Sequence, residues 1–159
     1  MKLATSDLCD QHGERVQVLD SSLRHYGGRT AFHGSVVTCR CFEDNSMVKR
    51  LSQQPGEGRV LVVDGGGSLR RALLGDLIAA ELRRNAWSGI VINGCVRDVD
   101  ALSEIDLGIL ALNSVPMKTE RRGQGDQEVV LRFAGATIAP GAWLYADTTG
   151  VIISAAEIT

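Results

Sequence analysis

The sequence predicts an α/β domain whose carboxyl-terminal part consists mostly of β-strands. Two short apolar runs rich in β-branched residues, RVLVVD at 59–64 and GIVIN at 89–93, are typical of strands that are buried on both faces. Between them, residues 77–82 have the apolar spacing of a helix. After residue 128 the apolar runs become short and are separated by turn residues, which indicates consecutive strands.

The amino-terminal third predicts two helices and one strand. Residues 4–12 are expected to form a short helix that ends at Gly13. Loose alternation of apolar side chains predicts a strand over residues 32–42. A second helix follows, with Asp44 or Asn45 as its cap, and it stops before the next Pro-Gly pair.

The central part alternates strands with helices. The strand at 59–64 ends at three glycines, and the helix around residues 77–82 leads to the strand at 89–93. Residues 98–105 predict a short helix, and residues 108–112 predict a third strand.

The carboxyl-terminal part begins with residues 118–127, which are polar, contain glycine and are expected to form a loop. Four short strands are expected after it, at 129–133, 136–138, 143–146 and 151–154. Turns at Pro140–Gly141 and at residues 147–150 separate them, and Asp147 is expected to be a turn residue.

The length and charge of the chain limit its functions. A chain of 159 residues is expected to form one domain, residues 1–159. Its formal net charge of -2 and its scattered basic residues argue against direct nucleic-acid binding. No apolar stretch is long enough to span a membrane, and the start lacks the apolar block of a signal peptide. We therefore expect a cytoplasmic protein that contacts neither nucleic acid nor membrane directly.

The cysteines and histidines do not predict a metal site. Cys39 and Cys41 would place two thiols on one face of a strand, but no second cysteine pair or histidine cluster completes a tetrahedral site. We expect all four cysteines to be reduced core residues. The three histidines are dispersed and are expected to be surface or hydrogen-bonded residues.

The three glycines at 65–67 suggest a dinucleotide site only superficially. The segment GGGSLRRALLGD contains neither a G-x-G-x-x-G pattern nor a Walker A sequence. Two interpretations remain: a tight turn where backbones approach closely, or the wall of a pocket at the carboxyl end of a strand.

The most informative pattern is Asp76 followed, after residues 77–96, by the pair Arg97–Asp98. Asp76 would lie at the start of a helix and Arg97–Asp98 just after a buried strand, so the two ends can meet at one pocket. Gly75 would let the backbone turn tightly, and the free amides of the first helical turn would favour a carboxylate ligand. The alternative for Asp76 is a simple helix N-cap.

Arg97 and Asp98 also allow two interpretations. Arg97 can bind a carboxylate in bidentate fashion. Asp98 can be the single carboxylate ligand of Mg²⁺, with waters and substrate oxygens completing the coordination. The alternative is an exposed salt bridge, with Asp98 or Asp100 capping the short helix.

These residues resemble a known family. The segments FHGSVVTCRCFEDN, VLVVDGGGSLRRALLGD, GIVINGCVRDVD and LYADTTGVIIS are similar to signatures of the RraA-like proteins. This family includes class II 4-hydroxy-4-methyl-2-oxoglutarate aldolases and regulators of ribonuclease E activity. The aldolase motif D-x20-R-D is intact as Asp76, Arg97 and Asp98.

The resemblance implies a single three-layer β/β/α domain of the swivelling type and a ring-shaped homotrimer with sites between subunits. It implies that the backbone of Gly75, Asp76, Leu77 and Ile78 and the side chain of Arg97 bind the pyruvyl carboxylate and keto oxygen. It further implies that Asp98 coordinates Mg²⁺ or Mn²⁺. Asp76 would hold a water on that metal and so move protons.

The chemistry of a 2-oxo acid is compatible with this implication. Retro-aldol cleavage and β-decarboxylation share a pyruvate enolate, which a Schiff-base lysine or a Lewis-acid metal can stabilise. The lysines are Lys2, Lys49 and Lys118, and none is expected in the pocket, which favours the metal.

Two functions are therefore expected to compete. The first is a metal-dependent aldolase that also decarboxylates oxaloacetate. The chain ends at Thr159, whereas longer aldolases of the family have an extension that reaches a neighbouring site, so oxaloacetate decarboxylation is expected to be the more robust activity. The second is a protein-binding inhibitor of ribonuclease E that needs no catalysis, and both can coexist.

Overall fold

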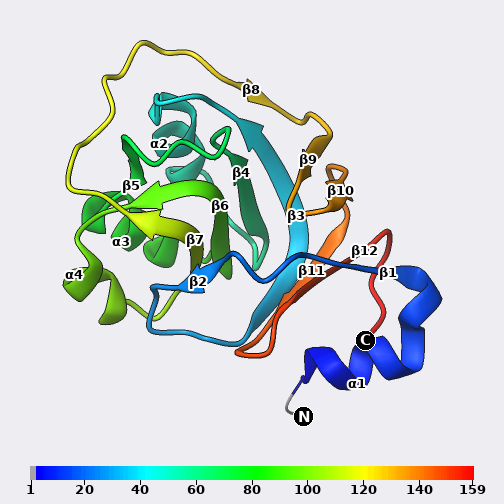
Figure 1. Ribbon diagram of the computed structural model, residues 1–159. Coiled ribbons are helices and arrows are strands. Elements are labelled where there is room, and N and C mark those ends of the chain that lie inside the picture. The colour runs from blue at the N-terminus through cyan, green and yellow to red at the C-terminus, as the bar shows by residue number, and fades with distance from the viewer. Residues whose placement is uncertain (1–2) are drawn as a thin grey trace.

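The computed structural model, which describes residues 3–159, has a central sheet between a layer of helices and a second layer of strands (Figure 1). The centre consists of four parallel strands in the order β3 (Phe32–Arg40), β4 (Val60–Asp64), β6 (Gly89–Val96) and β7 (Gly108–Ser114). Val60 and Val62 pack against the layer of strands, while Leu61 and Val63 pack against the helices. Because both faces are buried, the strand reads as a continuous apolar run.

The helical layer is made of α2 (Ser46–Ser52) and α3 (Asp76–Arg84), with α4 (Val99–Ser103) beside α3. Met47, Leu51, Ile78 and Leu82 of α2 and α3 are buried in the same cluster as the sheet residues Leu61 and Ile90. The candidate site borders this layer, because α3 begins at Asp76, which lines the cavity described below.

The second layer consists of the carboxyl-terminal strands. A hairpin of β9 (Leu131–Phe133) and β10 (Ala136–Ile138) and a second hairpin of β11 (Trp143–Ala146) and β12 (Val151–Ser154) form it. The strand β11 pairs with β3 and β12 pairs with β1 (Val16–Val18), so the main sheet curves from one layer into the other. The predicted three-layer β/β/α domain is confirmed.

Four short strands were not expected from the sequence. They are β1, β2 (Arg24–His25), β5 (Ala72–Leu74) and β8 (Asp126–Gln127). Each has only two or three residues, which is too few for an apolar alternation to stand out. The strand β8 occupies the last two residues of the predicted 118–127 loop, so the loop prediction is wrong for these two residues.

Several predicted boundaries also shift. The helix predicted over 98–105 covers only α4, and the strand predicted from residue 129 begins at Leu131. Gly13 follows α1 (Thr5–His12) but has helical angles and starts a 3₁₀ turn, Gly13–Arg15. The helical backbone therefore continues through Gly13, although the α-helix itself ends before it as predicted.

The helix α1 is attached to the carboxyl-terminal hairpin (Figure 1). Leu8 packs with the buried Tyr145 and Ile152. The carboxylate of Asp147 accepts hydrogen bonds from the amide and the hydroxyl of Thr5, both at 2.8 Å. Asp147 also accepts bonds from the amides of Thr149 and Gly150, so it is the predicted turn residue and caps α1 as well.

The cysteines are free, as predicted. Cys39, Cys41 and Cys95 are buried, and Cys9 is half-buried beside Leu8. The neighbouring Cys39 thiol and burial raise the pKa of Cys41 far above its usual range, so this thiol stays protonated.

Of the histidines, His25 forms a hydrogen bond between its Nε2 and the carbonyl of Asp147. Its buried Nδ1 has no partner among residues 3–159, so the expectation of a surface or fully hydrogen-bonded histidine is wrong for this residue.

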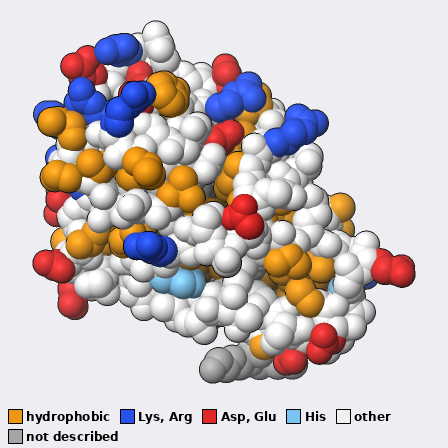
Figure 2. Space-filling view, in the orientation of Figure 1, with side chains coloured by type: hydrophobic (Ala, Val, Ile, Leu, Met, Phe, Trp, Pro, Cys, Tyr) orange, Lys and Arg blue, Asp and Glu red, His pale blue; other side chains and the backbone are white. Residues whose placement is uncertain are grey.

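Within residues 3–159, no helix has the length and apolar character needed to cross a membrane. Figure 2 shows one face of the surface, on which Lys and Arg side chains are mixed with Asp and Glu. Hydrophobic side chains also reach this surface in several places.

Candidate active site

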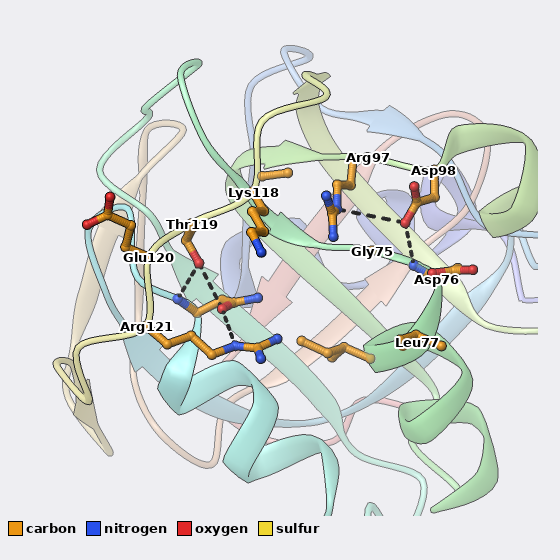
Figure 3. A pocket seen from close by; sticks show the side chains of 12 residues that line it. Gly75, Asp76, Leu77, Arg97, Asp98, Lys118, Thr119, Glu120 and Arg121 are labelled. Carbon is orange, nitrogen blue, oxygen red and sulfur yellow. Dashed lines mark hydrogen bonds and ion pairs between the residues drawn. The ribbon is translucent and has the colours of Figure 1, made fainter.

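The ends of β5 and β6 bring the residues of the predicted pocket together. The two strands run parallel, with Leu74 opposite Val96, and the amide of Arg97 donates a hydrogen bond to the carbonyl of Leu74 (2.9 Å). The chain leaves β5 at Gly75 and enters α3, and it leaves β6 at Arg97. A cavity of about 580 Å³ is lined by all six residues expected at the site: Gly75, Asp76, Leu77, Ile78, Arg97 and Asp98 (Figure 3).

Asp98 is held in an uncommon backbone conformation. Its φ of 57° and ψ of 45° are left-handed, which few residues other than glycine adopt and Asp tolerates better than most. Its Oδ2 accepts a hydrogen bond from the amide of Asp76 (3.1 Å) and lies 3.9 Å from Nε of Arg97. Oδ1 makes no hydrogen bond within residues 3–159. The left-handed turn thus directs a carboxylate with one open oxygen toward the start of α3.

Gly75 is required for a reason that differs from the sequence interpretation. Its φ of -127° and ψ of -171° are extended, so the backbone turn itself does not need glycine. A Cβ at this position would lie 2.7 Å from Oδ2 of Asp98 and 3.3 Å from Nε of Arg97. The glycine therefore makes room for the two charged side chains.

The start of α3 presents unbonded amides to the cavity. Gly75 is the N-cap, so the simple N-cap interpretation of Asp76 is wrong, and Asp76 is the first residue of the helix. The amides of Leu77 and Ile78 lie in the first turn, where no intrahelical acceptor exists. Together with the helix dipole they favour an anion at this end of the cavity.

The opposite wall of the cavity comes from the segment after β7, which sequence reasoning did not place there. Lys118, Thr119, Glu120 and Arg121 all line the cavity (Figure 3). The expectation that no lysine lies in the pocket is therefore wrong for Lys118; Lys49 does not line the cavity, and Lys2 lies outside the described residues. The sheet topology could have indicated this wall. Because β7 runs parallel to β6, the chain leaves both strands at the same edge of the sheet.

A buried amide holds this segment in place. Asn45 is only 8% exposed, and its Oδ1 accepts hydrogen bonds from the hydroxyl of Thr119 (2.8 Å) and from Nε of Arg121 (3.1 Å). Its Nδ2 donates to the carbonyl of Leu73 (3.2 Å), which is part of β5. The side chain of Asn45 thus connects the two walls of the cavity.

A buried carboxylate fixes the rest of the segment. Asp44 accepts hydrogen bonds from the amides of Arg122 (2.8 Å) and Gln124 (3.2 Å) and from both the amide and hydroxyl of Ser46. Burial alone would raise the pKa of Asp44, but these hydrogen bonds outweigh it and lower the pKa below its usual value. Of the two expected caps of α2, Asn45 is the N-cap residue, while the Ser46 amide donates to the side chain of Asp44, one residue earlier.

The glycines at 65–67 do not line the cavity. Gly66 and Gly67 have positive φ angles of 68° and 74°, and Oδ1 of Asp64 accepts a hydrogen bond from the Gly66 amide (2.9 Å). Of the two interpretations, the tight turn is the one that the structure supports.

The donors at the site suit a hard cation bound by few protein ligands. Across the described chain, no three His, Cys, Asp or Glu side chains are close enough together to bind a metal by themselves. Mg²⁺ is commonly bound by one or two carboxylates, with waters and substrate oxygens as further ligands. The open Oδ1 of Asp98, with Asp76 beside it, fits this kind of site.

Comparison with known proteins gives matches over nearly the whole chain. The model of the RraA-like family, described as Aldolase/RraA, matches residues 5–153. A protein of Pseudomonas fluorescens strain SBW25 is 58% identical over 94% of this chain and 92% of its own length, and it is named as a 4-hydroxy-4-methyl-2-oxoglutarate aldolase.

Two solved structures are also similar. One is described as the RNA-processing inhibitor RraA from Thermus thermophilis, with a TM-score of 0.96, 40% identity and coverage of 100% of this chain and 96% of that chain. The other is described as an S-adenosylmethionine:2-dimethylmenaquinone methyltransferase from Geobacillus kaustophilus HTA426, with a TM-score of 0.95, 39% identity and coverage of 98% and 97%.

Proposed function

The chain belongs to the RraA-like family, and from this premise we propose that it is a lyase, a divalent-metal-dependent class II aldolase. It would cleave 4-hydroxy-4-methyl-2-oxoglutarate and similar 2-oxo acids to pyruvate, and it would also decarboxylate oxaloacetate. The observation that carries the proposal is the meeting of Arg97, the open oxygen of Asp98 and the free amides of α3 at one cavity.

In this proposal the chain's own residues bind the pyruvyl end of the substrate. Arg97 pairs with the carboxylate, and the amides of Leu77 and Ile78 donate to the same group. A divalent cation bound by Asp98 would supply a Lewis acid at the 2-oxo oxygen. The substrate is thus oriented with its C3–C4 bond directed toward the 118–121 wall.

The reaction then needs one proton removed and one returned. Loss of the proton from the 4-hydroxyl allows the C3–C4 bond to break, and its electron pair moves through C3 and C2 to the keto oxygen. The released carbonyl compound leaves, and protonation at C3 gives pyruvate. With oxaloacetate the same bond breaks with loss of CO₂. Asp76, half-buried at the helix start beside Asp98, would hold the water that carries the proton.

An oxaloacetate assay tests the proposal. Pyruvate release should require Mg²⁺ or Mn²⁺ and stop when EDTA is added. Arg97→Ala should lower kcat/KM by roughly a hundredfold or more, because the paired charge-assisted hydrogen bonds that hold and orient the pyruvyl carboxylate are lost. The matched control is Arg84→Ala, which removes an exposed arginine at the far end of α3 and should be near wild type. Pyruvate release that is absent at every metal concentration would contradict the proposal.

The methyltransferase name of one similar structure is not favoured by the cavity. None of the residues that line it is aromatic, and seven of them have charged or amide side chains: Asn45, Asp76, Arg97, Asp98, Lys118, Glu120 and Arg121. Sites for an adenine ring and a quinone ring are usually lined by apolar and aromatic side chains. The lining instead suits a small, highly charged acid.

Regulation of ribonuclease E is a second candidate, supported by the 40% identity to the RNA-processing inhibitor over the whole chain. We propose it as a protein-binding role that is separate from the cavity. The complex with ribonuclease E should then survive Asp98→Ala in a pull-down with purified proteins. If no complex forms with wild type at low salt, this second function is excluded.

We also propose that the protein forms a homotrimer. Leu77, which lines the cavity, is 82% exposed, and Met117, the neighbour of the lining residue Lys118, is 54% exposed. Exposed apolar side chains that cluster at a functional site often mark a protein interface. A neighbouring subunit would cover this side of the cavity.

A further inference from the structure

We propose that Arg121, assisted by Lys118, binds a second carboxylate at the far end of the substrate. This builds on the proposed function and specifies its substrate class: 2-oxo acids with another carboxylate beyond the bond that breaks. The two cations would select such dicarboxylic acids against 2-oxo acids that end in an alkyl group.

The charges of the cavity are divided between its two walls. Asp76, Asp98 and the cation Arg97 lie on the α3 side, where the metal and the pyruvyl group would bind. Lys118 and Arg121 lie on the opposite side. The one carboxylate of that wall, Glu120, forms an ion pair with Arg122 (2.9 Å) outside the cavity lining. Over residues 3–159, neither Lys118 nor Arg121 forms an ion pair with a carboxylate.

Arg121 is oriented by the protein before any ligand binds. Its Nε donates to the buried Oδ1 of Asn45, and this hydrogen bond uses the inner edge of the guanidinium. The two terminal amino groups remain available to form a pair of parallel hydrogen bonds with a carboxylate. Figure 3 shows the guanidinium extending from its loop toward the start of α3. The same buried oxygen thus anchors the segment through Thr119 and orients Arg121.

Both arginines line the same cavity, so one dicarboxylic substrate would face them both. Arg97 and Arg121 come from separate walls of one cavity, and Lys118 lies between them in the close view (Figure 3). A substrate whose first carboxylate pairs with Arg97 would extend across the cavity toward Arg121. Recognition of the far carboxylate then needs no carboxyl-terminal extension from a neighbouring subunit, in contrast to the expectation from the sequence.

Binding of two matched ligands tests the inference. The ligands are 2-oxoglutarate and 2-oxopentanoate, which differ in a terminal carboxylate against a methyl group, and calorimetry with Mg²⁺ present measures their affinities. Wild type should prefer 2-oxoglutarate by about tenfold or more, as expected for a charge-assisted pair. Arg121→Gln should lose most of this preference, and Arg121→Lys should keep part of it. The control Arg122→Gln removes the same charge from the next residue, which does not line the cavity, and should keep the full preference.

Kinetics supply the second measurement. Arg121→Gln should raise KM for 4-hydroxy-4-methyl-2-oxoglutarate about tenfold or more and change kcat less than about threefold, because the far carboxylate is held equally before and during bond cleavage. The inference is overturned if Arg121→Gln weakens both ligands equally or neither. If wild type cleaves no substrate yet still prefers 2-oxoglutarate through Arg121, the proposed reaction fails while the binding inference stands.

Discussion

At the scale of single residues, Gly75 and Asp98 determine the geometry of the cavity. Asp98 adopts left-handed angles that direct its carboxylate at the start of α3, and Gly75 leaves the space which that carboxylate occupies. Backbone strain of this kind persists where the surroundings stabilise it, and it is frequent at functional sites. The two residues form one unit, although residues 76–97 separate them in the chain.

Gly75→Ala tests this unit. The added Cβ would lie 2.7 Å from Oδ2 of Asp98, so the carboxylate must move. We expect pyruvate release from oxaloacetate to fall by roughly tenfold to a hundredfold, because small displacements of reacting groups have effects of this size. Gly13→Ala is the control, since its Cβ would meet nothing within 4 Å and its backbone is helical. Equal activity of both variants would show that the close approach does not matter.

Lys118 raises a mechanistic alternative that the sequence interpretation had set aside. A lysine in the cavity could form a Schiff base with the 2-oxo group instead of the metal acting as Lewis acid. We expect no covalent adduct when the protein is treated with pyruvate and borohydride, as followed by intact mass. An increase in mass that disappears in Lys118→Met would favour the Schiff base and contradict the metal-dependent route.

At the scale of elements, the segment after β7 is a structured wall and not a free loop. Asp44 and Asn45, at the start of α2, bind residues 119–124 through side-chain hydrogen bonds. Sequence patterns could not predict this contact, because nothing local connects residue 45 with residue 119. The same holds for Arg121, whose orientation depends on Asn45.

The lowered pKa of Asp44 predicts an acid-sensitive wall. Its folded pKa lies below the ordinary value of 3.8, so its contribution to the free energy of unfolding is complete above about pH 4 and is lost as the pH falls through the folded pKa. At pH 7, Asp44→Asn should lower the free energy of unfolding by about 1–3 kcal/mol, because several amides lose a charged acceptor.

Denaturant unfolding between pH 3 and pH 7 checks this prediction. The Asp44→Asn variant should lose less stability on acidification than wild type does. Asp126→Asn is the control, since Asp126 is exposed and its ion pair with Arg40 is long (3.5 Å), so the effect should be small. Identical acid profiles of wild type and Asp44→Asn would contradict the role given to this carboxylate.

At the scale of the whole molecule, the layers follow from the sequence more directly than the site does. Strands such as 60–64 are predictable because burial on both faces requires a continuous apolar run. The meeting of Gly75 with Arg97 was predictable from the succession of helix, strand and turn. The second wall was not, because its position depends on where the chain passes after β7. The role of Gly75 could not be predicted either, because it depends on where the side chains of Arg97 and Asp98 lie.

The proposed trimer is a property of the whole molecule and can be measured directly. Sedimentation velocity should give a mass about three times the chain mass of 17.1 kDa. Met117→Asp should lower the trimer fraction, because it places a charge among the exposed apolar side chains beside the cavity. Val18→Asp is the control, since Val18 is 61% exposed on β1 at the far end of the strand order. A monomeric wild type would exclude the trimer.

The pairing of β3 with β11, and of β1 with β12, has a consequence for biosynthesis. The strands Val16–Val18 and Phe32–Arg40 are translated more than 100 residues before their partners, Val151–Ser154 and Trp143–Ala146. Until then the early strands have open edges, which are prone to pair with other chains. The native sheet can therefore close only after Val151–Ser154 has been translated, and until then the early strands have no partner for these edges.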